Sequence, residues 1–325
     1  MTGFDAGMTG FDAGMTGFDA PMTGLTRPVT GAERVIEVLS PGPLATVQDL
    51  GRPGFADLGV SRSGAADRGA LRLANRLVGN DESAAGIEIT FGGLSLRLAG
   101  GAATLAFTGA RCELSGHRGG WNAALSCPSG SVLTVGAPAS GLRSYLAVRG
   151  GLAVPRVLGS RATDTLSGLG PAVLAAGRRL LIGPAAAGEP GDFSGAAGSG
   201  PPAGTVTLRL AAGPRADWFT SDSLGRLFGS AWQVRPDSNR IGTRLAGTAL
   251  RLRQDAERAA AELPSEPTLP GAVQVPPDGQ PIVLGPDAPV TGGYPVIAVL
   301  PGPELDLLAQ LRSGAELRFA PVRGA

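Results

Sequence analysis

The chain has 325 residues, a net charge of +1 and 43% hydrophobic residues, so it is long enough for two ordinary domains with their own cores. All 28 basic residues are Arg and are scattered, which excludes a Schiff-base, P-loop or biotinylated Lys on this chain and gives no basic footprint for nucleic acid or a membrane surface. A single His and two Cys exclude a His-rich or Cys-rich metal site, and no apolar run reaches the roughly 18 residues that span a bilayer.

The first 32 residues differ from the rest of the chain. Residues 1–21 repeat Met-Thr-Gly-Phe-Asp-Ala-Gly/Pro three times, and Met22-Thr-Gly-Leu follows as a shortened copy. The period of seven does not predict a coiled coil, because only one position of the repeat is large and apolar. The segment also lacks the basic and apolar regions of a signal peptide. We therefore predict a disordered leader over residues 1–32.

Residues 33–184 are predicted to form an N-terminal β-barrel domain. An apolar, β-branched run at Val35–Leu39 predicts its first strand. Residues Asp67–Val78 predict a helix with one apolar face, which Ser63 or Asp67 could cap and Gly79-Asn80 could end. From residue 86 to residue 183, short alternating strands with Gly turns predict a closed or nearly closed antiparallel barrel.

Residues 185–204 are rich in Gly, Ala and Pro without a periodic apolar face, and we predict a flexible linker there. Residues 205–325 are predicted to form a C-terminal β-barrel domain. It begins with a strand at Val206–Leu210 and includes helices at Ala216–Phe228 and near Glu304–Leu311. The chain is thus expected to be mainly β, with a few short helices.

Residues 265–299 hold three short strand patterns separated by Gly and Pro turns: Ala272–Val275, Pro281–Leu284 and Pro295–Leu300. Such turns fix φ through Pro and allow positive φ through Gly. They suit a rigid loop surface where the backbone approaches a ligand or a partner chain. A tightly turned barrel rim without chemistry would give the same pattern.

No standard catalytic motif is present: H-E-x-x-H, G-x-G-x-x-G and G-x-S-x-G are all absent from the sequence. A Ser-His-Asp triad would need His117, which lies in a predicted exposed hairpin loop. Cys112 and Cys127 could pair, but free buried thiols in a cytosolic protein are expected. The chemistry is therefore expected to rest on carboxylates, arginines, amides and backbone donors.

An amide, a carboxylate and a guanidinium lie within five residues at Gln48, Asp49 and Arg52. They could bind a small amide or carboxylate substrate, or an Asp49–Arg52 pair could simply lock the turn. At the predicted helix start, Ser61, Ser63 and Asp67 could frame an anion site at free N–H groups, or they could act as plain caps.

Glu88 lies in the predicted strand Gly86–Thr90, on the face opposite to Ile87 and Ile89. That face could line a cleft or meet solvent.

Several long blocks of the sequence resemble one protein family. They are Leu39–Gly54, Gly59–Asp67, Leu73–Asn80, Glu88–Thr90 and Ser265–Val299. In this order they resemble the family called allophanate hydrolase subunit 2, or biotin-dependent carboxyltransferase-like proteins, which includes KipA and the C subunit of 5-oxoprolinase. The resemblance runs from about Val35 to Val322. It implies two cyclophilin-like antiparallel β-barrel domains with a cleft between them.

The resemblance also implies site residues. Ser238–Arg244 is similar to the family's Ser-Asp/Asn-Arg-x-Gly-x-Arg segment, and the block 265–299 is similar to its carboxy-terminal signature. On this basis the expected catalytic residues are Asp67, Glu88 and Glu266. The expected substrate-binding residues are Gln48, Asp49, Arg52, Ser63, Asn239, Arg240, Gln274, Thr291 and Tyr294. No metal is expected on this chain.

The family implies a bacterial, cytoplasmic enzyme component that works only in a hetero-oligomer. The implied reaction is ATP-dependent cleavage of the 5-oxo-L-proline lactam to L-glutamate, with partners of the KipI type (the B subunit) and the LamB/YcsF type (the A subunit). Because no nucleotide-binding motif is present, ATP is expected to bind elsewhere or at a shared interface. One alternative is biotin-dependent carboxyl transfer to urea or a related amide. A second alternative is a KipA-like regulatory partner of a KipI-type kinase inhibitor.

Overall fold

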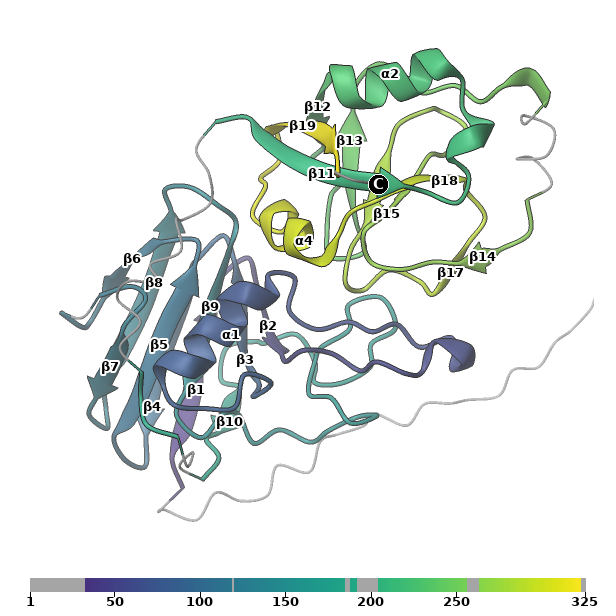
Figure 1. Ribbon diagram of the computed structural model, residues 1–325. Helices are drawn as coiled ribbons and strands as arrows, with labels where there is room; N and C mark the ends of the chain where they lie inside the picture. Colours follow the sequence, from purple (N-terminus) through teal and green to yellow (C-terminus); the bar gives the residue numbers. More distant parts are fainter. Residues whose placement is uncertain (1–32, 119, 185–187, 192–203, 256–262, 323–325) are drawn as a thin grey trace, which may run out of the picture. The chain divides into compact units, whose positions relative to one another are not determined.

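The computed structural model describes residues 33–118, 120–184, 188–191, 204–255 and 263–322 (Figure 1). The predicted leader, residues 1–32, lies outside the described residues, as does the predicted linker 185–204 except for residues 188–191 and 204. The chain is mainly β, as predicted. Among the described residues, no helix is long and apolar enough to cross a membrane.

The strands of residues 35–181 form two five-stranded antiparallel sheets. In the first, the order is β10 (Arg179–Leu181), β1 (Val35–Pro41), β4 (Leu94–Ala99), β8 (Val132–Pro138) and β6 (Cys112–Ser115). In the second, the order is β2 (Leu44–Gln48), β3 (Gly86–Thr90), β9 (Arg143–Val148), β5 (Ala103–Gly109) and β7 (Ala124–Cys127).

One apolar core lies between these two sheets. Alternation along the strands puts Leu94, Leu96 and Leu98 of β4 into it from the first sheet, and Ile87 and Ile89 of β3 from the second. The free thiols of Cys112 and Cys127 are buried in the same core, in agreement with the prediction.

Helix α1 (Arg68–Leu77) covers the other face of the second sheet. Its apolar residues Ala70, Leu71, Ala74 and Leu77 are buried, as the periodicity predicted. They pack on β5 and β9, so all six residues of β9 are buried: one face meets the core and the other meets the helix. Polar groups on that second face, including Glu88, are therefore covered by protein.

The strands of residues 206–321 form a closed barrel. Its order is β11 (Val206–Ala212), β18 (Val296–Val299), β15 (Ala272–Gln274), β16 (Ile282–Leu284), β13 (Gly242–Ala246), β12 (Ala231–Val234) and β19 (Glu316–Pro321). The three strands expected in residues 265–299 are present and adjacent in this barrel. The strand pairing that closes this barrel differs from the predicted, purely antiparallel arrangement. Strand β19 pairs with β11 in parallel and with β12 antiparallel.

Short helices and one small sheet complete the fold. The helix predicted over Ala216–Phe228 is divided, because Thr220 takes an extended conformation and its side chain caps the helix that follows. The remaining elements are η1 (Ala56–Leu58), η3 (Ala216–Trp218), α2 (Ser221–Gly229), α4 (Gly302–Leu308) and the β14 (Glu266–Pro267)–β17 (Thr291–Gly292) pair.

Candidate active site

Arg240 lies at the centre of a buried ion network that joins the second sheet to the barrel. It precedes β13 and is only 3% exposed. Its Nε and Nη2 donate to the Asp287 carboxylate at 2.8 and 2.9 Å, and its Nη1 donates to Glu88 at 2.5 Å. Burial opposes the charge of Arg240, but Glu88 and Asp287 raise its pKa above the ordinary value. This guanidinium is therefore fully paired with residues of the chain.

Glu88 is a second member of this network. It is 1% exposed, which excludes the solvated alternative. Its carboxylate accepts hydrogen bonds from the Tyr145 hydroxyl at 2.7 Å and from the Ala66 N–H at 2.9 Å. Burial alone would raise the pKa of Glu88, but Arg240 and Arg143 hold that pKa below its ordinary value. Glu88 thus stays ionised and is a poor proton acceptor near neutral pH.

Asp67, which adjoins this network, differs from Glu88 in the direction of its pKa shift. Its Oδ1 accepts from the Ala70 N–H at 2.8 Å and so caps α1, and its Oδ2 accepts from Gln310 Nε2 at 2.6 Å. Burial raises the pKa of Asp67 to about 6. A carboxyl group that titrates close to neutrality suits proton transfer.

The start of α1 has no free N–H groups for an external anion. The Asp67 N–H donates to Tyr145, the N–H groups of Arg68 and Gly69 donate to Asp306, and the Ala70 N–H donates to Asp67 itself. The expectation of an anion at this helix start is therefore corrected, because acceptors from the chain already occupy the position. Asp67 acts as the cap, as the alternative interpretation had it.

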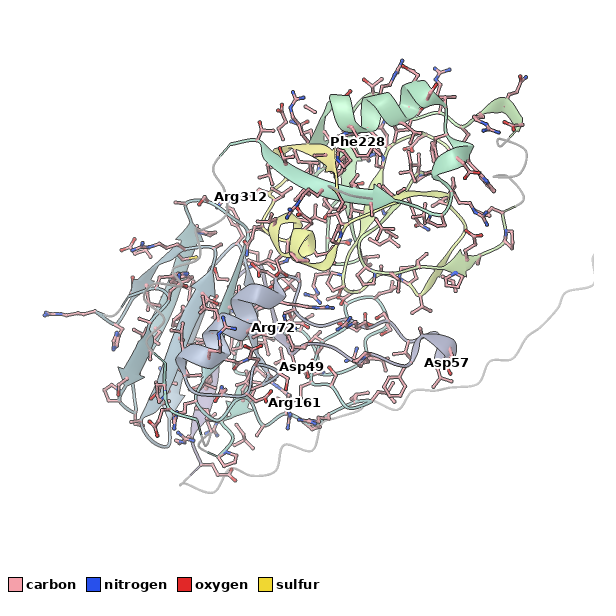
Figure 2. All side chains as sticks on the ribbon, viewed as in Figure 1. Asp49, Asp57, Arg72, Arg161, Phe228 and Arg312 are labelled. Atoms are coloured by element: carbon pink, nitrogen blue, oxygen red, sulfur yellow. The ribbon has the colours of Figure 1, made fainter. Side chains whose placement is uncertain are left out.

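A segment of residues 160–165 contacts most of the candidates from the β2–α1 region. Asp49 accepts from the Ser160 hydroxyl and from the Arg161 N–H, both at 2.6 Å (Figure 2). Gln48 Nε2 donates to the Thr163 carbonyl at 2.9 Å. Arg52 donates to the Ala162 carbonyl and lies 3.9 Å from Asp164. Asp49 and Arg52 thus bind this segment rather than each other.

Ser63 connects this segment to the Arg240 network. Its hydroxyl lies 3.2 Å from the Thr163 carbonyl and 2.7 Å from Asp287. Asp287 also accepts from the Thr165 N–H and hydroxyl. Burial would raise the pKa of Asp287, but Arg240 and these donors lower it. One continuous polar network therefore runs from Asp49 to Asp67.

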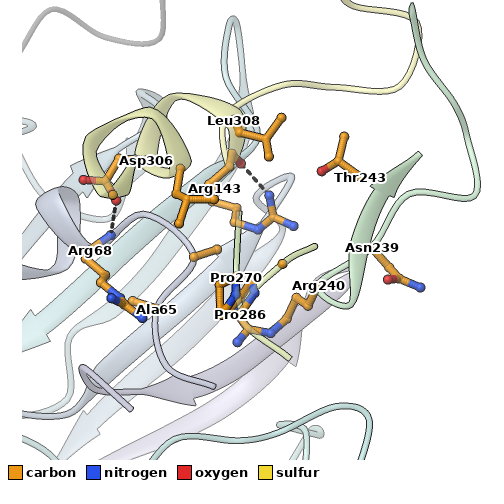
Figure 3. A pocket seen from close by; sticks show the side chains of 15 residues that line it. Ala65, Arg68, Arg143, Asn239, Arg240, Thr243, Pro270, Pro286, Asp306 and Leu308 are labelled. Carbon is orange, nitrogen blue, oxygen red and sulfur yellow. Dashed lines mark hydrogen bonds between the residues drawn. The ribbon is translucent and has the colours of Figure 1, made fainter. Parts of the chain in front are cut away.

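Two cavities adjoin this network and share part of their lining, including Arg68 and Leu305. The smaller, about 50 Å³, is lined by Arg143, Arg240 and Asn239 (Figure 3). The larger, about 380 Å³, is lined by Arg52, Arg62 and Arg68; we call it the arginine cavity. Its volume lies within the usual range for small-molecule sites.

The candidates from residues 265–294 gather at the β14–β17 pair instead. Glu266 forms an ion pair with Arg215, and Thr291 lies on β17, where it pairs with Pro267. Gln274 Nε2 donates to the Tyr294 carbonyl at 3.4 Å. Tyr294 is 45% exposed and lines a separate cavity of about 270 Å³. The predicted site residues therefore fall into two groups.

Asn239 adjoins the first group but uses its side chain locally. Its Oδ1 accepts from the N–H groups of Ile241 and Gly242, which fixes the turn before β13. Within the described part of the chain, no group of three or more His, Cys, Asp or Glu side chains is arranged to hold a metal ion.

Several members of the network were not predicted from the sequence: Tyr145, Asp287, Arg143, Asp164 and Gln310. Asp287 lies inside the block 265–299 that carried the resemblance, and its position after Gly285-Pro286 was the available signal. Arg143 begins strand β9, in which every residue is buried, and a buried Arg needs a carboxylate partner.

The chain is similar to known proteins along most of its length. The family model described as "Carboxyltransferase domain, subdomain A and B" matches residues 58–321. The chain is 40% identical to the C subunit of 5-oxoprolinase from Escherichia coli, over 88% of this chain and 90% of that protein. It is 32% identical to the C subunit of 5-oxoprolinase from Haemophilus influenzae, over 89% and 91%.

A solved structure has the same fold. The crystal structure of the Kluyveromyces lactis urea amidolyase matches with a TM-score of 0.84 and 29% identity over 91% of this chain. The matched region spans 19% of that protein. The chain is therefore similar to one part of a much longer polypeptide as well as to subunits of its own length.

Proposed function

Because this chain belongs to the family of carboxyltransferase domains with subdomains A and B, we propose that it functions as the C subunit of an ATP-dependent 5-oxoprolinase. The observation that carries the proposal is the 40% identity to the E. coli protein over nearly the full length of both chains. The complete enzyme would be a bacterial, cytoplasmic hetero-oligomer. Its other two components would be of the LamB/YcsF type and the KipI type.

The reaction opens a stable lactam. ATP would supply a phosphoryl group to the amide oxygen, which makes the ring carbon electrophilic. Water would then add to that carbon, and the ring C–N bond would break with a proton passing to the nitrogen, which leaves the side-chain carboxyl group as an acyl phosphate. A second water would hydrolyse this acyl phosphate to the carboxylate of glutamate and inorganic phosphate. The sequence has no Lys and no Gly-rich phosphate loop, so we place the nucleotide on the partner subunits or at a shared interface.

Within this chain we assign proton transfer to Asp67. Its raised pKa, about 6, lets it accept a proton near neutral pH, whereas Glu88 is held ionised by Arg240. Asp67 lies between Ala66 and Arg68, which line the smaller cavity. Glu88 and Arg240 would position the residues around Asp67, because both side chains are engaged within the network. Glu266, held by Arg215, keeps its predicted catalytic role only as a second candidate.

Carboxyl transfer from carboxybiotin to urea or a related amide is the second candidate function. The match to the K. lactis urea amidolyase favours it, since 91% of this chain is covered. Biotin would have to be carried by another protein, because this chain has no Lys to accept it.

The deciding experiment is a reconstitution with the candidate partner subunits. ATP-dependent release of glutamate from 5-oxoproline is measured for this chain, for the partners alone and for the complete complex. We expect turnover only in the complete complex. A stable complex without turnover would refute the proposal and favour a KipA-like regulatory role. Urea carboxylation on addition of a biotin carboxylase and its biotin carrier would favour the second candidate.

Two variants test the role of Asp67 in the same assay. Asp67→Asn keeps a capping oxygen but cannot accept the proton, so kcat should fall about 100-fold or more. Asp222→Asn is the matched control, because Asp222 is exposed on α2 and pairs with Arg226 one turn further on. Full activity of Asp67→Asn would remove Asp67 from the mechanism.

A further inference from the structure

The arginine cavity carries three positive side chains and no negative one. Among the described residues that line it, none is Asp or Glu. Arg52, Arg62 and Arg68 come from a single stretch that runs from the end of β2 to the start of α1. A cavity with this lining attracts anions, because no carboxylate on its wall balances the charge.

Arg52 is held with unused donors. It is 1% exposed, and its Nε and Nη1 have no hydrogen-bond partner among the described residues. Its Nη2 donates to the Ala162 carbonyl, which fixes the guanidinium in place. The nearest carboxylate is Asp164 at 3.9 Å, and that group is already occupied by the Ser61 hydroxyl and by the N–H groups of Leu166 and Ser167. These two donors are closed to solvent, so Arg52 contributes positive charge to the wall of the cavity rather than an open hydrogen-bond donor.

Arg68 and Arg62 supply charge at the same wall. Their guanidinium groups have no hydrogen bond or ion pair within the described part of the chain. Burial, and then the neighbouring charge of Arg62, lower the pKa of Arg68 to about 10. Arg68 remains charged at neutral pH, and an anion near it would relieve both effects. Asp306 offsets part of this charge, but its two oxygens already accept the N–H groups of Arg68 and Gly69.

The rest of the wall is largely apolar. It includes Phe55, Val60, Leu269, Leu300 and Leu305, with Thr268 as a neutral polar side chain. Leu269 is 69% exposed, so the cavity is open to solvent at that point. Apolar walls with a few convergent donors favour a small ring that carries one anionic group. They fit a nucleotide less well, because its ribose and phosphates need polar partners throughout.

We infer that the arginine cavity is a carboxylate subsite, in which Arg62 and Arg68 bind the carboxylate of a small cyclic amide substrate and the buried charge of Arg52 lies behind them. The inference rests on the proposed function, under which that substrate is 5-oxo-L-proline. Arg guanidinium groups pair with carboxylates through two parallel hydrogen bonds, and the guanidinium groups of Arg62 and Arg68 have no competing partner within the described part of the chain.

The first test measures binding to the full chain and to the assembled complex by calorimetry, without turnover. Three probes separate the sources of the anion: 5-oxo-L-proline, 2-pyrrolidinone (the same lactam without the carboxylate) and inorganic phosphate. We expect 5-oxo-L-proline to bind about 10- to 100-fold more tightly than 2-pyrrolidinone. Equal binding of the two lactams, or binding of phosphate alone, would overturn the inference.

Variants locate the subsite. Arg68→Ala should weaken 5-oxo-L-proline binding about tenfold or more, and the double variant with Arg62→Ala should weaken it further. Arg72→Ala is the matched control: it lies one turn along the same helix, pairs with Glu82 and does not line the cavity. Unchanged binding in Arg68→Ala and in the double variant would overturn the assignment.

Turnover in the complex separates this inference from the proposed function. If both hold, Arg68→Ala raises KM for 5-oxo-L-proline and leaves kcat within about threefold. If the complex turns over normally with an unchanged KM in the variant, the subsite is refuted and the function stands. If 5-oxo-L-proline binds through these arginines but the complex has no turnover, the function is refuted and the subsite stands.

Discussion

Replacing Arg240 by Met should strongly destabilise the protein. The change keeps the length of the side chain but leaves the Glu88 and Asp287 carboxylates buried without their cation. Removing one partner of a buried ion pair typically costs about 3–5 kcal/mol, because the remaining charge has lost its compensation. We expect a loss of unfolding free energy in this range at pH 8. The control Arg97→Met, which removes an exposed pair with Glu37, should cost less than about 1 kcal/mol.

The pH dependence of this loss gives a sharper test. In the wild type, Arg240 lowers the pKa of the Glu88 and Asp287 carboxyl groups. Their contribution to the free energy of unfolding is therefore present at neutral pH and is lost as the pH falls through their folded-state pKa values. Without Arg240, burial would raise both pKa values, and protonation at low pH would relieve the unpaired charges. The destabilisation by Arg240→Met should therefore be largest at pH 8 and smaller at pH 5.

Urea unfolding followed by fluorescence and circular dichroism at the two pH values measures this difference. Trp232 is buried in the barrel core and reports on the half of the chain that carries Arg240. A loss below about 1 kcal/mol at pH 8 would refute the view that the network joins the two halves. A loss that grows towards pH 5 would refute the assigned charge states.

Two further predictions concern Asp67 and a glycine beside the network. Between pH 4 and pH 7, the unfolding free energy of Asp67→Asn should rise relative to the wild type by about 2 kcal/mol, because the raised folded-state pKa of Asp67 lowers the stability of the wild type as the pH increases. Parallel slopes for the two proteins would contradict the raised pKa. Gly64→Ala should cost more than Gly54→Ala by about 2 kcal/mol in thermal or urea unfolding. Both glycines have φ near +94°, but only a Cβ added at Gly64 would clash with the backbone, at 2.7 Å from the Gly51 nitrogen. Equal losses of stability in the two variants would show that the loop moves to accommodate the Cβ.

The periodicity of apolar residues correctly predicted helices and strands whose formation depends on residues close together in the sequence. The helix over Asp67–Val78 and the alternating strand of Leu94, Leu96 and Leu98 follow from burial on one face, which the sequence displays directly. The helix over Ala216–Phe228 was predicted less well, because the competing cap at Thr220 ends one helical turn and begins another.

Partnerships across the chain could not be predicted in this way. Arg240 lies 152 residues from Glu88, and no periodicity links the two positions. Alternation placed Glu88 opposite Ile87 and Ile89, but it could not show that α1 covers that face. The short spacing of Asp49 and Arg52 made a pair between them one of two alternatives, whereas the tertiary structure gives each of them different partners in residues 160–164.

The residues from α4 to β19 have a consequence for how the protein is made. Strand β19 closes the barrel between β11 and β12, and Gln310, just after α4, reaches Asp67 across 243 positions of sequence. A ribosome synthesises the chain from the N-terminus, so the first two sheets emerge long before these contacts can form. The Asp67 carboxyl and the barrel would therefore reach their native state only once residues up to 321 have left the exit tunnel. Newly made chains that stop short of β19 would then carry an open barrel edge, a target for chaperones and proteases.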